Sequence, residues 1–209
     1  MQRAISPNAK DDRRLRLLEA ALDEFFERGF AAARMEDIAK RIDLSKGTVY
    51  LYFKSKDELF RALIAHLATP NIEIIEGLIT QSPGFGDAMN RLAAFAPALI
   101  RESRMPKLMK VLIGDSHTFP DIIKTYRETV MDRLLHMFAK LLERAKEAGE
   151  IQVGDPLLAA RLILAPVAFS ALWHATFNKA SDAEVDLETL FSMHANAMKA
   201  AFLTTETTP

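Results

Sequence analysis

The stretch Met35–Leu59, MEDIAKRIDLSKGTVYLYFKSKDEL, carries two short helical patterns, a tight turn between them and the start of a third helix. Apolar residues between Met35 and Ile42 follow the i, i+3, i+4, i+7 spacing of one buried helical face. Asp43 tolerates the left-handed backbone conformation that can end a helix. Ser45 is a favoured N-cap, so the second helix is expected to start just after it. This layout is a helix-turn-helix, which places its second helix in a DNA major groove.

A third helix is expected to begin at Lys56, because Ser55 is a second N-cap residue and Glu58 stands three positions later, as in a capping box. The segment DLSKGTVYLYFKSKDEL, residues 43–59, closely resembles the DNA-binding motif of the TetR family of bacterial transcription regulators. A Ser-Lys-Gly-Thr segment, an aromatic pair and a Ser-Lys pair carry the resemblance, which extends over residues 13–67.

Two positions depart from the pattern of that family. Ala33 and Arg34 stand where the family usually has hydroxyl residues, and Asp43 stands where its turn usually has Gly. The first departure weakens the expected helix cap and phosphate contact. Arg34 could supply the phosphate contact in their place.

The resemblance implies an all-α fold with two functional parts. Residues 1–55 would form a three-helix helix-turn-helix DNA-binding domain, with a mobile N-terminal arm over about residues 1–10. Residues 56–80 would be a connecting helix. Residues 81–209 would form a helical bundle for ligand binding and dimerisation. The implied partners are a double-stranded DNA operator, a small-molecule effector and a second copy of the chain.

Helical geometry divides the residues of the second motif helix between two faces. Val49 and Phe53 are four positions apart, so they share a face and are expected to be buried. Lys46 lies at a helix N-terminus, where its ammonium and free backbone N–H groups can both meet a phosphate. Gly47 allows close approach to DNA, and Thr48 can contact a base edge. The expected DNA-binding residues are Arg34, Ser45, Lys46, Gly47, Thr48, Tyr50, Tyr52 and Lys56.

The pattern alone leaves a second interpretation open, in which Tyr50 and Tyr52 are half-buried packing residues and the lysines form a solvated face. The resemblance favours DNA contact for them. Lys40 and Arg41, on the preceding helix, are expected to be solvated instead.

Charge and composition agree with a soluble globular protein. The chain has 209 residues, a net charge of −1 and no Cys, which excludes disulfides and thiolate-ligated metals. The first 66 residues hold 13 basic and 11 acidic residues, whereas the remainder is net acidic. That sign suits DNA binding by the N-terminal part. The N-terminus lacks the apolar region of a secretory signal, so a cytoplasmic location is expected.

Periodicity predicts helices throughout and no alternating strand pattern, so the fold class is all-α. The helix that begins at Lys56 is expected to be interrupted near Thr69-Pro70, because Pro disfavours helix geometry in the residue before it. The predicted helical ranges outside the motif are 11–28, 56–80, 87–102, 106–113, 118–148, 155–178 and 183–203.

The run from Leu157 to Trp173, LLAARLILAPVAFSALW, is apolar nearly all round. It is shorter than a membrane span and contains Arg161 and Pro166, so a buried helix is favoured over a membrane helix. Such a helix must be covered on both sides. One side would pack on its own domain and the other on a second subunit. The expected dimer-interface residues are Leu158, Leu162, Phe169, Leu190, Met193 and Met198.

No catalytic or metal site is expected. Asp115, Ser116 and His117 are the residue types of a hydrolase triad, but adjacent residues cannot adopt triad geometry. The five histidines are scattered, and none forms the i, i+4 pair of a zinc helix. No cofactor is expected either.

A ligand pocket is implied by the resemblance and permitted by the residues. Aromatic and Met side chains recur in the C-terminal part, and Pro97 and Pro166 imply helix kinks that leave room for a cavity. The expected pocket residues are Phe95, Met105, Met109, His117, Tyr126, Trp173 and Phe177.

These observations favour a ligand-responsive DNA-binding regulator, most simply a repressor released from a palindromic operator by a small apolar effector. A constitutive or architectural DNA-binding protein without effector is the alternative, and a cavity in the C-terminal part would separate the two. An all-α enzyme would need convergent titratable groups, which the sequence does not offer.

Overall fold

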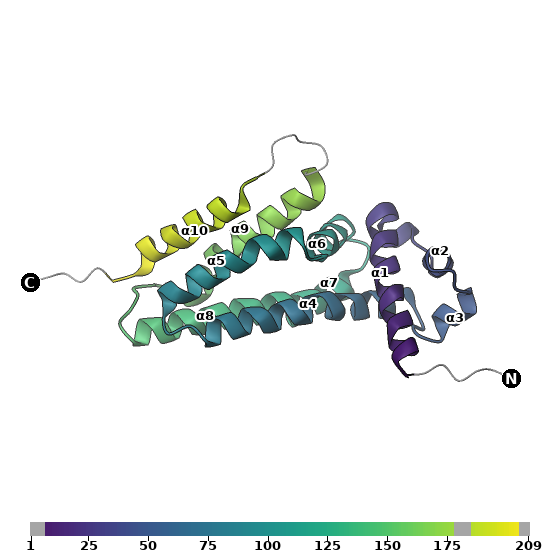
Figure 1. Cartoon of the computed structure of the whole chain (residues 1–209), viewed down its shortest axis with the longest axis horizontal. Coiled ribbons are helices and arrows are strands. Elements are labelled where there is room, and N and C mark those ends of the chain that lie inside the picture. Colours follow the sequence, from purple (N-terminus) through teal and green to yellow (C-terminus); the bar gives the residue numbers. More distant parts are fainter. Residues whose placement is uncertain (1–6, 178–184, 205–209) are drawn as a thin grey trace, which may run out of the picture. The chain divides into compact units, whose positions relative to one another are not determined.

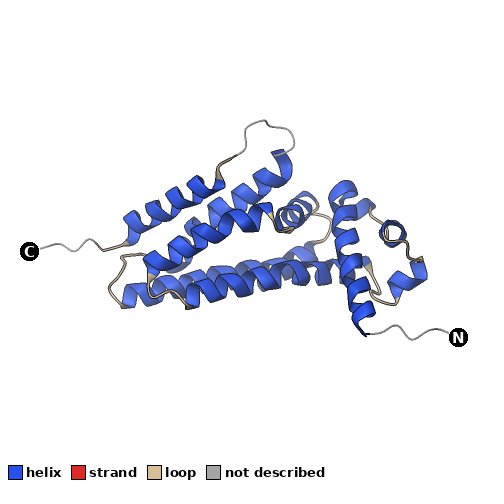
Figure 2. Cartoon of the chain, viewed as in Figure 1, coloured by secondary structure: helices blue, strands red, loops and turns tan. Residues whose placement is uncertain are grey.

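The computed structural model describes residues 7–177 and 185–204, with side chains from residue 10 onward. Over these ranges the chain is built from helices and connecting loops (Figure 2), and a single isolated β-bridge joins Ile151 to Leu203. The chain divides into two compact units. Unit 1 comprises residues 1–67 and 107–126, and unit 2 comprises residues 68–106 and 127–209.

Unit 1 contains the helix-turn-helix and a segment from much later in the chain. Residues 107–126, which the sequence assigned to the C-terminal domain, pack with the N-terminal helices instead. The division of the chain therefore differs from the predicted boundaries after residues 55 and 80. The helices of this unit are α1 (Pro7–Ala32), α2 (Met35–Arg41), α3 (Lys46–Tyr50), the first part of α4 (Lys56–Thr80), nearly all of α6 (Met105–Gly114) and α7 (Pro120–Tyr126) (Figure 1).

Helix α1 begins at Pro7, so part of the predicted N-terminal arm is helical, whereas residues 1–6 lie outside the described residues. Its backbone leaves helical geometry at Gly29, where φ is 77° and ψ is 156°. This region of backbone space is accessible essentially to Gly alone. The predicted helix of residues 11–28 therefore ends where the regular geometry breaks, although α1 resumes after Gly29 and ends at Ala32.

Four phenylalanine rings form the centre of unit 1. Phe25 and Phe30 come from α1, Phe60 from α4 and Phe119 from the loop before α7. The ring centroids of neighbouring pairs lie 4.6–5.4 Å apart, mostly tilted or edge-to-face. Aromatic pairs favour this geometry. The rings join the end of α1, the start of α4 and the residue 107–126 segment into one core.

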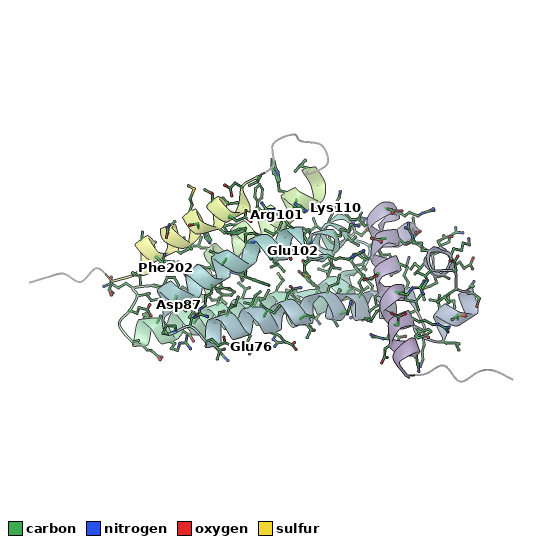
Figure 3. All side chains as sticks on the ribbon, viewed as in Figure 1. Glu76, Asp87, Arg101, Glu102, Lys110 and Phe202 are labelled. Carbon is green, nitrogen blue, oxygen red and sulfur yellow. The ribbon has the colours of Figure 1, made fainter. Side chains whose placement is uncertain are left out.

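Unit 2 is a helical bundle. It contains the rest of α4, α5 (Phe85–Arg101), the π-helical turn η1 (Arg127–Met131), α8 (Asp132–Glu147), α9 (Pro156–Phe177) and α10 (Leu187–Phe202). Helix α10 runs alongside α5 (Figure 1), and its last ring, Phe202, lies beside the first turn of α5, near Asp87 (Figure 3). The centroids of Phe202 and Phe85 are 6.0 Å apart.

Two predicted helices differ from the observed ones. Helix α4 continues through Pro70 without the expected interruption. A buried Pro-containing helix can persist where packing outweighs the cost of the missing hydrogen bond, about 3 kcal/mol. Ile72, Ile75 and Ile79 beyond it are all buried. The predicted helix 118–148 instead starts at Pro120 and is divided by η1 into α7 and α8.

Two helices, α4 and α9, are long and apolar enough to cross a membrane by length and composition. A core helix of a soluble protein meets the same test. Helix α9 begins after Asp155, whose Oδ1 accepts hydrogen bonds from Leu157 N at 2.8 Å and Leu158 N at 3.1 Å. The predicted start is confirmed. The predicted end of this helix at Asn178 and the predicted start of the last helix at Ala183 fall outside the described residues, and α10 is described from Leu187.

Candidate nucleic-acid interface

Helix α3 is fixed at its start by Ser45. The Ser45 hydroxyl accepts a hydrogen bond from Thr48 N at 3.1 Å and lies 2.8 Å from Thr48 Oγ1. The predicted N-cap is therefore confirmed, and it also orients the Thr48 hydroxyl. Val49 is fully buried and Phe53 is nearly so, as the helical spacing predicted. This leaves the opposite face of α3 free for another molecule.

The turn between α2 and α3 is compact. Asp43 has φ of 56°, and it is the one residue other than Gly with positive φ in the described part of the chain. The predicted left-handed conformation at this position is confirmed. Arg34 is the N-cap of α2 and makes no side-chain cap. Its side chain is exposed, as a phosphate contact requires.

The exposed face of α3 carries Lys46, Gly47 and Tyr50, with Thr48 and Tyr52 half-buried beside them. A Cβ added at Gly47 would meet only Ser45 Oγ, 3.9 Å away. Packing within the structure therefore does not explain why position 47 is Gly.

Lys46 forms an ion pair with Glu36 of α2, and both side chains are about half exposed. The pairing raises the pKa of Lys46 and lowers the pKa of Glu36 through their hydrogen bond and charge attraction. A phosphate arriving at Lys46 must compete with this carboxylate. The pair therefore reduces the positive charge that α3 presents.

The Lys56 side chain conflicts with its predicted contact to phosphate. Its Nζ donates to the carbonyl oxygens of Phe30 at 2.5 Å, Ala31 at 3.2 Å and Ala33 at 3.0 Å. An ammonium has three N–H donors, so all are in use. It also lies 4.5 Å from the Phe30 ring centroid. Burial lowers the pKa of Lys56. The ammonium thus holds the end of α1 rather than facing outward.

The start of α4 is as predicted, except that one hydrogen bond of the expected capping box is shifted by one residue. Ser55 Oγ accepts from Glu58 N at 3.1 Å, so Ser55 caps α4. The Glu58 carboxylate accepts from Lys54 N at 2.7 Å, one residue earlier than in a regular capping box.

Arg41, which was expected to be solvated, is exposed at the surface but also forms ion pairs. Its Nε donates to Glu24 Oε2 at 2.7 Å, and its guanidinium also pairs with Glu27. Glu24 is buried, with 1% of its surface exposed. A buried carboxylate needs such a partner. Arg41 and Glu24 therefore fasten α2 to α1, whereas Lys40 pairs with Asp37 at the surface, as expected for a solvated residue.

Asp115 has a structural role that the sequence did not reveal. Its Oδ2 accepts a hydrogen bond from Phe30 N at 2.7 Å, next to the break at Gly29. The partners are 85 residues apart in the chain. The one sequence signal at this position is the Asp-Ser-His run, whose residue types are those of a hydrolase triad and give no indication of this hydrogen bond. Asp115 and Lys56 together fix the segment that leads into α2.

The predicted pocket residues do not gather at one place. Phe95 lines an apolar cavity of about 60 Å³ in unit 2, together with Met89, Leu92, Phe138 and His194. Trp173 lines a separate apolar groove of about 320 Å³. Phe177 is 46% exposed, but its ring centroid lies 4.8 Å from that of Trp173, so these two predicted residues are neighbours. His117 is exposed on unit 1. The remaining candidates, Met105, Met109 and Tyr126, are half-buried or mostly buried outside these two hollows.

The predicted dimer residues lie on the outer face of α9 and α10. Exposed fractions reach 61% for Leu158, 57% for Leu162, 64% for Phe169 and 64% for Met193. Leu190 and Met198 are partly buried. Four of the six predicted residues are therefore accessible to another molecule.

A helix-turn-helix whose second helix is capped and has one buried and one exposed face, in a chain that also forms a helical bundle, is typical of DNA-binding transcription regulators. Comparison with known proteins agrees. The family model for bacterial regulatory proteins of the tetR family matches residues 17–63, and that for the AefR-like transcriptional repressor C-terminal domain matches residues 87–189. The chain belongs to the TetR family of transcriptional regulators and is not an enzyme.

Relatives are similar over most of the chain. The HTH-type transcriptional regulator YfiR of Bacillus subtilis (strain 168) is 25% identical over 159 residues, which cover 75% of this chain and 77% of YfiR. A putative TetR-family regulator from Mesorhizobium loti has a TM-score of 0.75 at 24% identity, covering 96% of this chain and all of its own. SmeT of Stenotrophomonas maltophilia, in complex with triclosan, has a TM-score of 0.75 at 22% identity, covering 94% of each chain.

Proposed function

We propose that the protein is a homodimeric repressor that binds a near-palindromic operator and is released from it by a small apolar effector. The observation that carries the proposal is that helix α3 has one buried face and one accessible face. Its Val49 side is buried, whereas Lys46, Gly47, Thr48 and Tyr50 remain accessible. A helix presented in this way suits the major groove.

The DNA contacts divide by chemistry. Lys46, Arg34 and the Tyr50 and Tyr52 hydroxyls meet phosphates, which position the protein without reading sequence. The Thr48 side chain, oriented by Ser45, reads a base edge. The Lys56 ammonium is not among these contacts, because its three N–H donors already bind backbone carbonyl oxygens.

Binding experiments test this division. Lys46→Ala should weaken binding to all duplexes and lower the salt slope by at most about one unit, because Lys46 contacts its phosphate in competition with Glu36. Thr48→Ala should relax discrimination at one base position by about 1–3 kcal/mol. Gel shifts that show no preference among duplexes would contradict the proposal.

We propose that the second copy of the chain covers the exposed face of α9 and α10. A two-fold dimer places its two recognition helices about 34–36 Å apart, in successive major grooves. Leu158→Glu or Leu162→Glu would bury an unpaired charge at the proposed dimer interface and yield monomer or aggregate, and neither residue lines the Trp173 groove. Analytical ultracentrifugation checks this. If both variants sediment as intact dimers, the interface lies elsewhere.

We place the effector in the Trp173 groove of unit 2. Its volume of about 320 Å³ is in the range of small-ligand sites, whereas the cavity at Phe95 is too small without expansion. Pro166, Phe169 and Leu187 supply apolar walls, and Arg101 and His174 supply polar groups. Solved structures of the same fold contain triclosan in SmeT and stearoyl-CoA in FadR of Bacillus subtilis, which supports an apolar ligand here.

Trp173 is the only Trp in the chain, so its fluorescence reports directly on this groove. Triclosan and stearoyl-CoA are suitable first probes. An effector in the groove should change Trp173 emission, and Trp173→Phe should remove the signal. Ligands that release DNA without affecting Trp173 would place the effector site elsewhere.

Calorimetry separates a ligand-responsive repressor from a constitutive DNA-binding protein. A coupling free energy of about 1–3 kcal/mol changes DNA affinity roughly 5–150-fold, and operator DNA must weaken ligand binding by the same factor. Equal ligand affinities with and without operator would favour the constitutive alternative. A cytoplasmic location follows from the proposed access to DNA.

A further inference from the structure

Leu51 is an apolar side chain with no place in the protein core. It is 82% exposed, more than any other large apolar residue in the described part of the chain. Its neighbours two positions away on either side, Val49 and Phe53, are almost completely buried. An isolated exposed Leu is ordinary. This one, however, lies on the helix proposed to enter the DNA groove.

The backbone places Leu51 on the same face as the proposed base-reading residue. Leu51 is the C-cap of α3 and keeps helical angles, with φ of −73° and ψ of −23°. Its N–H donates to the Thr48 carbonyl at 3.2 Å. Residues three and four apart are neighbours on a helix surface, so Leu51 adjoins both Thr48 and Gly47.

The direction of the side chain matters as much as its position. A helical side chain leans towards the N-terminus and covers the turn before its own Cα. That turn contains Gly47, which has no side chain, and an added Cβ there would meet only Ser45 Oγ, 3.9 Å away. Leu51 and Gly47 thus form a shallow apolar surface next to the Thr48 hydroxyl.

The major groove offers one apolar group for such a surface, the 5-methyl group of thymine. We propose that Leu51 is a specificity-determining residue that contacts a thymine methyl beside the base read by Thr48. This inference rests on the proposed function, because it requires α3 to lie in the major groove.

The test begins with duplexes selected from a random library by the full-length protein. Each thymine of the best duplex is then replaced by deoxyuridine, which lacks only the methyl group. For the wild-type protein we expect one position per half-site where the replacement weakens binding about fourfold, the equivalent of one buried CH₂ group at about 0.8 kcal/mol. For Leu51→Ala we expect no further weakening at that position.

Ile113→Ala is the matched control, because Ile113 is also an exposed apolar residue, at 54%, but lies on α6. This variant should retain the full deoxyuridine effect. Thermal melting should show that Leu51→Ala folds normally, since most of the side chain faces solvent. Leu51→Met should retain the effect, because its side chain is apolar and of similar size.

The outcomes separate the two proposals. A library that yields no preferred duplex contradicts the proposed function and the Leu51 contact with it. A preferred duplex without a thymine effect, or one whose deoxyuridine penalty is unchanged in Leu51→Ala, overturns the Leu51 contact alone.

Discussion

Replacing Gly29 by Ala should strongly destabilise unit 1. Ala must adopt φ of 77° and ψ of 156°, at a cost of about 1–3 kcal/mol. Its Cβ would lie 3.2 Å from Asp115 Oδ2 and 3.4 Å from Oδ1, so the carboxylate must move. That movement weakens the 2.7 Å hydrogen bond from Phe30 N, a charged bond worth about 1.5–3 kcal/mol. Together we expect a loss of about 2–5 kcal/mol, a large part of a typical domain's stability of about 5–15 kcal/mol.

Gly149 provides a matched control. It also has positive φ, 73°, but an added Cβ would meet nothing within 4 Å. Gly149→Ala should therefore incur only a backbone cost of about 1–2 kcal/mol. Comparing the two variants by urea denaturation isolates the crowding of Asp115.

A double-mutant cycle tests the proposed cause. Asp115→Ala alone removes the hydrogen bond to Phe30 N, but in the Gly29→Ala background that bond is already weakened. The two effects on the free energy of unfolding should therefore be less than additive by at least about 0.5 kcal/mol. Additive effects, or a Gly29→Ala variant no less stable than Gly149→Ala, would refute the reasoning. DNA binding should fall in parallel, because this segment leads directly into α2.

Three further predictions concern other parts of the chain. Gly47→Ala should stabilise α3 by about 0.5–1 kcal/mol, because Ala favours helix and finds space, yet weaken DNA binding; thermal melting and gel shifts together check this opposite response. Glu36→Gln should release Lys46 and remove a charge that repels phosphate, so binding to all duplexes should tighten and the salt slope should steepen; an unchanged slope would contradict the competition. Burial raises the pKa of Tyr126 to about 12. The unfolded chain therefore loses this phenol proton first, so the free energy of unfolding should fall as pH rises from about 10 to 12. Tyr126→Phe should remove both this part of the stability loss and the corresponding phenolate absorbance step.

Local signals in the sequence determined the form of the motif. Ser45 caps α3 and Asp43 takes the left-handed turn, because both effects depend on groups within a few residues. Burial of Val49 and Phe53 follows from a helical period that can be read directly. The helical period also predicted the all-α class. The starts of α4 and α9 were predictable because residues immediately before each helix cap it.

Tertiary structure alone decided which distant groups meet. Lys56 binds carbonyls 23–26 residues away, and Asp115 binds an N–H 85 residues away. Periodicity shows that a face is buried but does not name its partner, so packing of residues 107–126 into unit 1 could not be foreseen. The sequence also does not show whether a basic side chain meets water, a phosphate or a backbone carbonyl, or whether an acidic one meets water or a backbone N–H. Only the position of competing acceptors and donors in the folded chain distinguishes these roles, because an ammonium with three protein acceptors has no donor left for DNA.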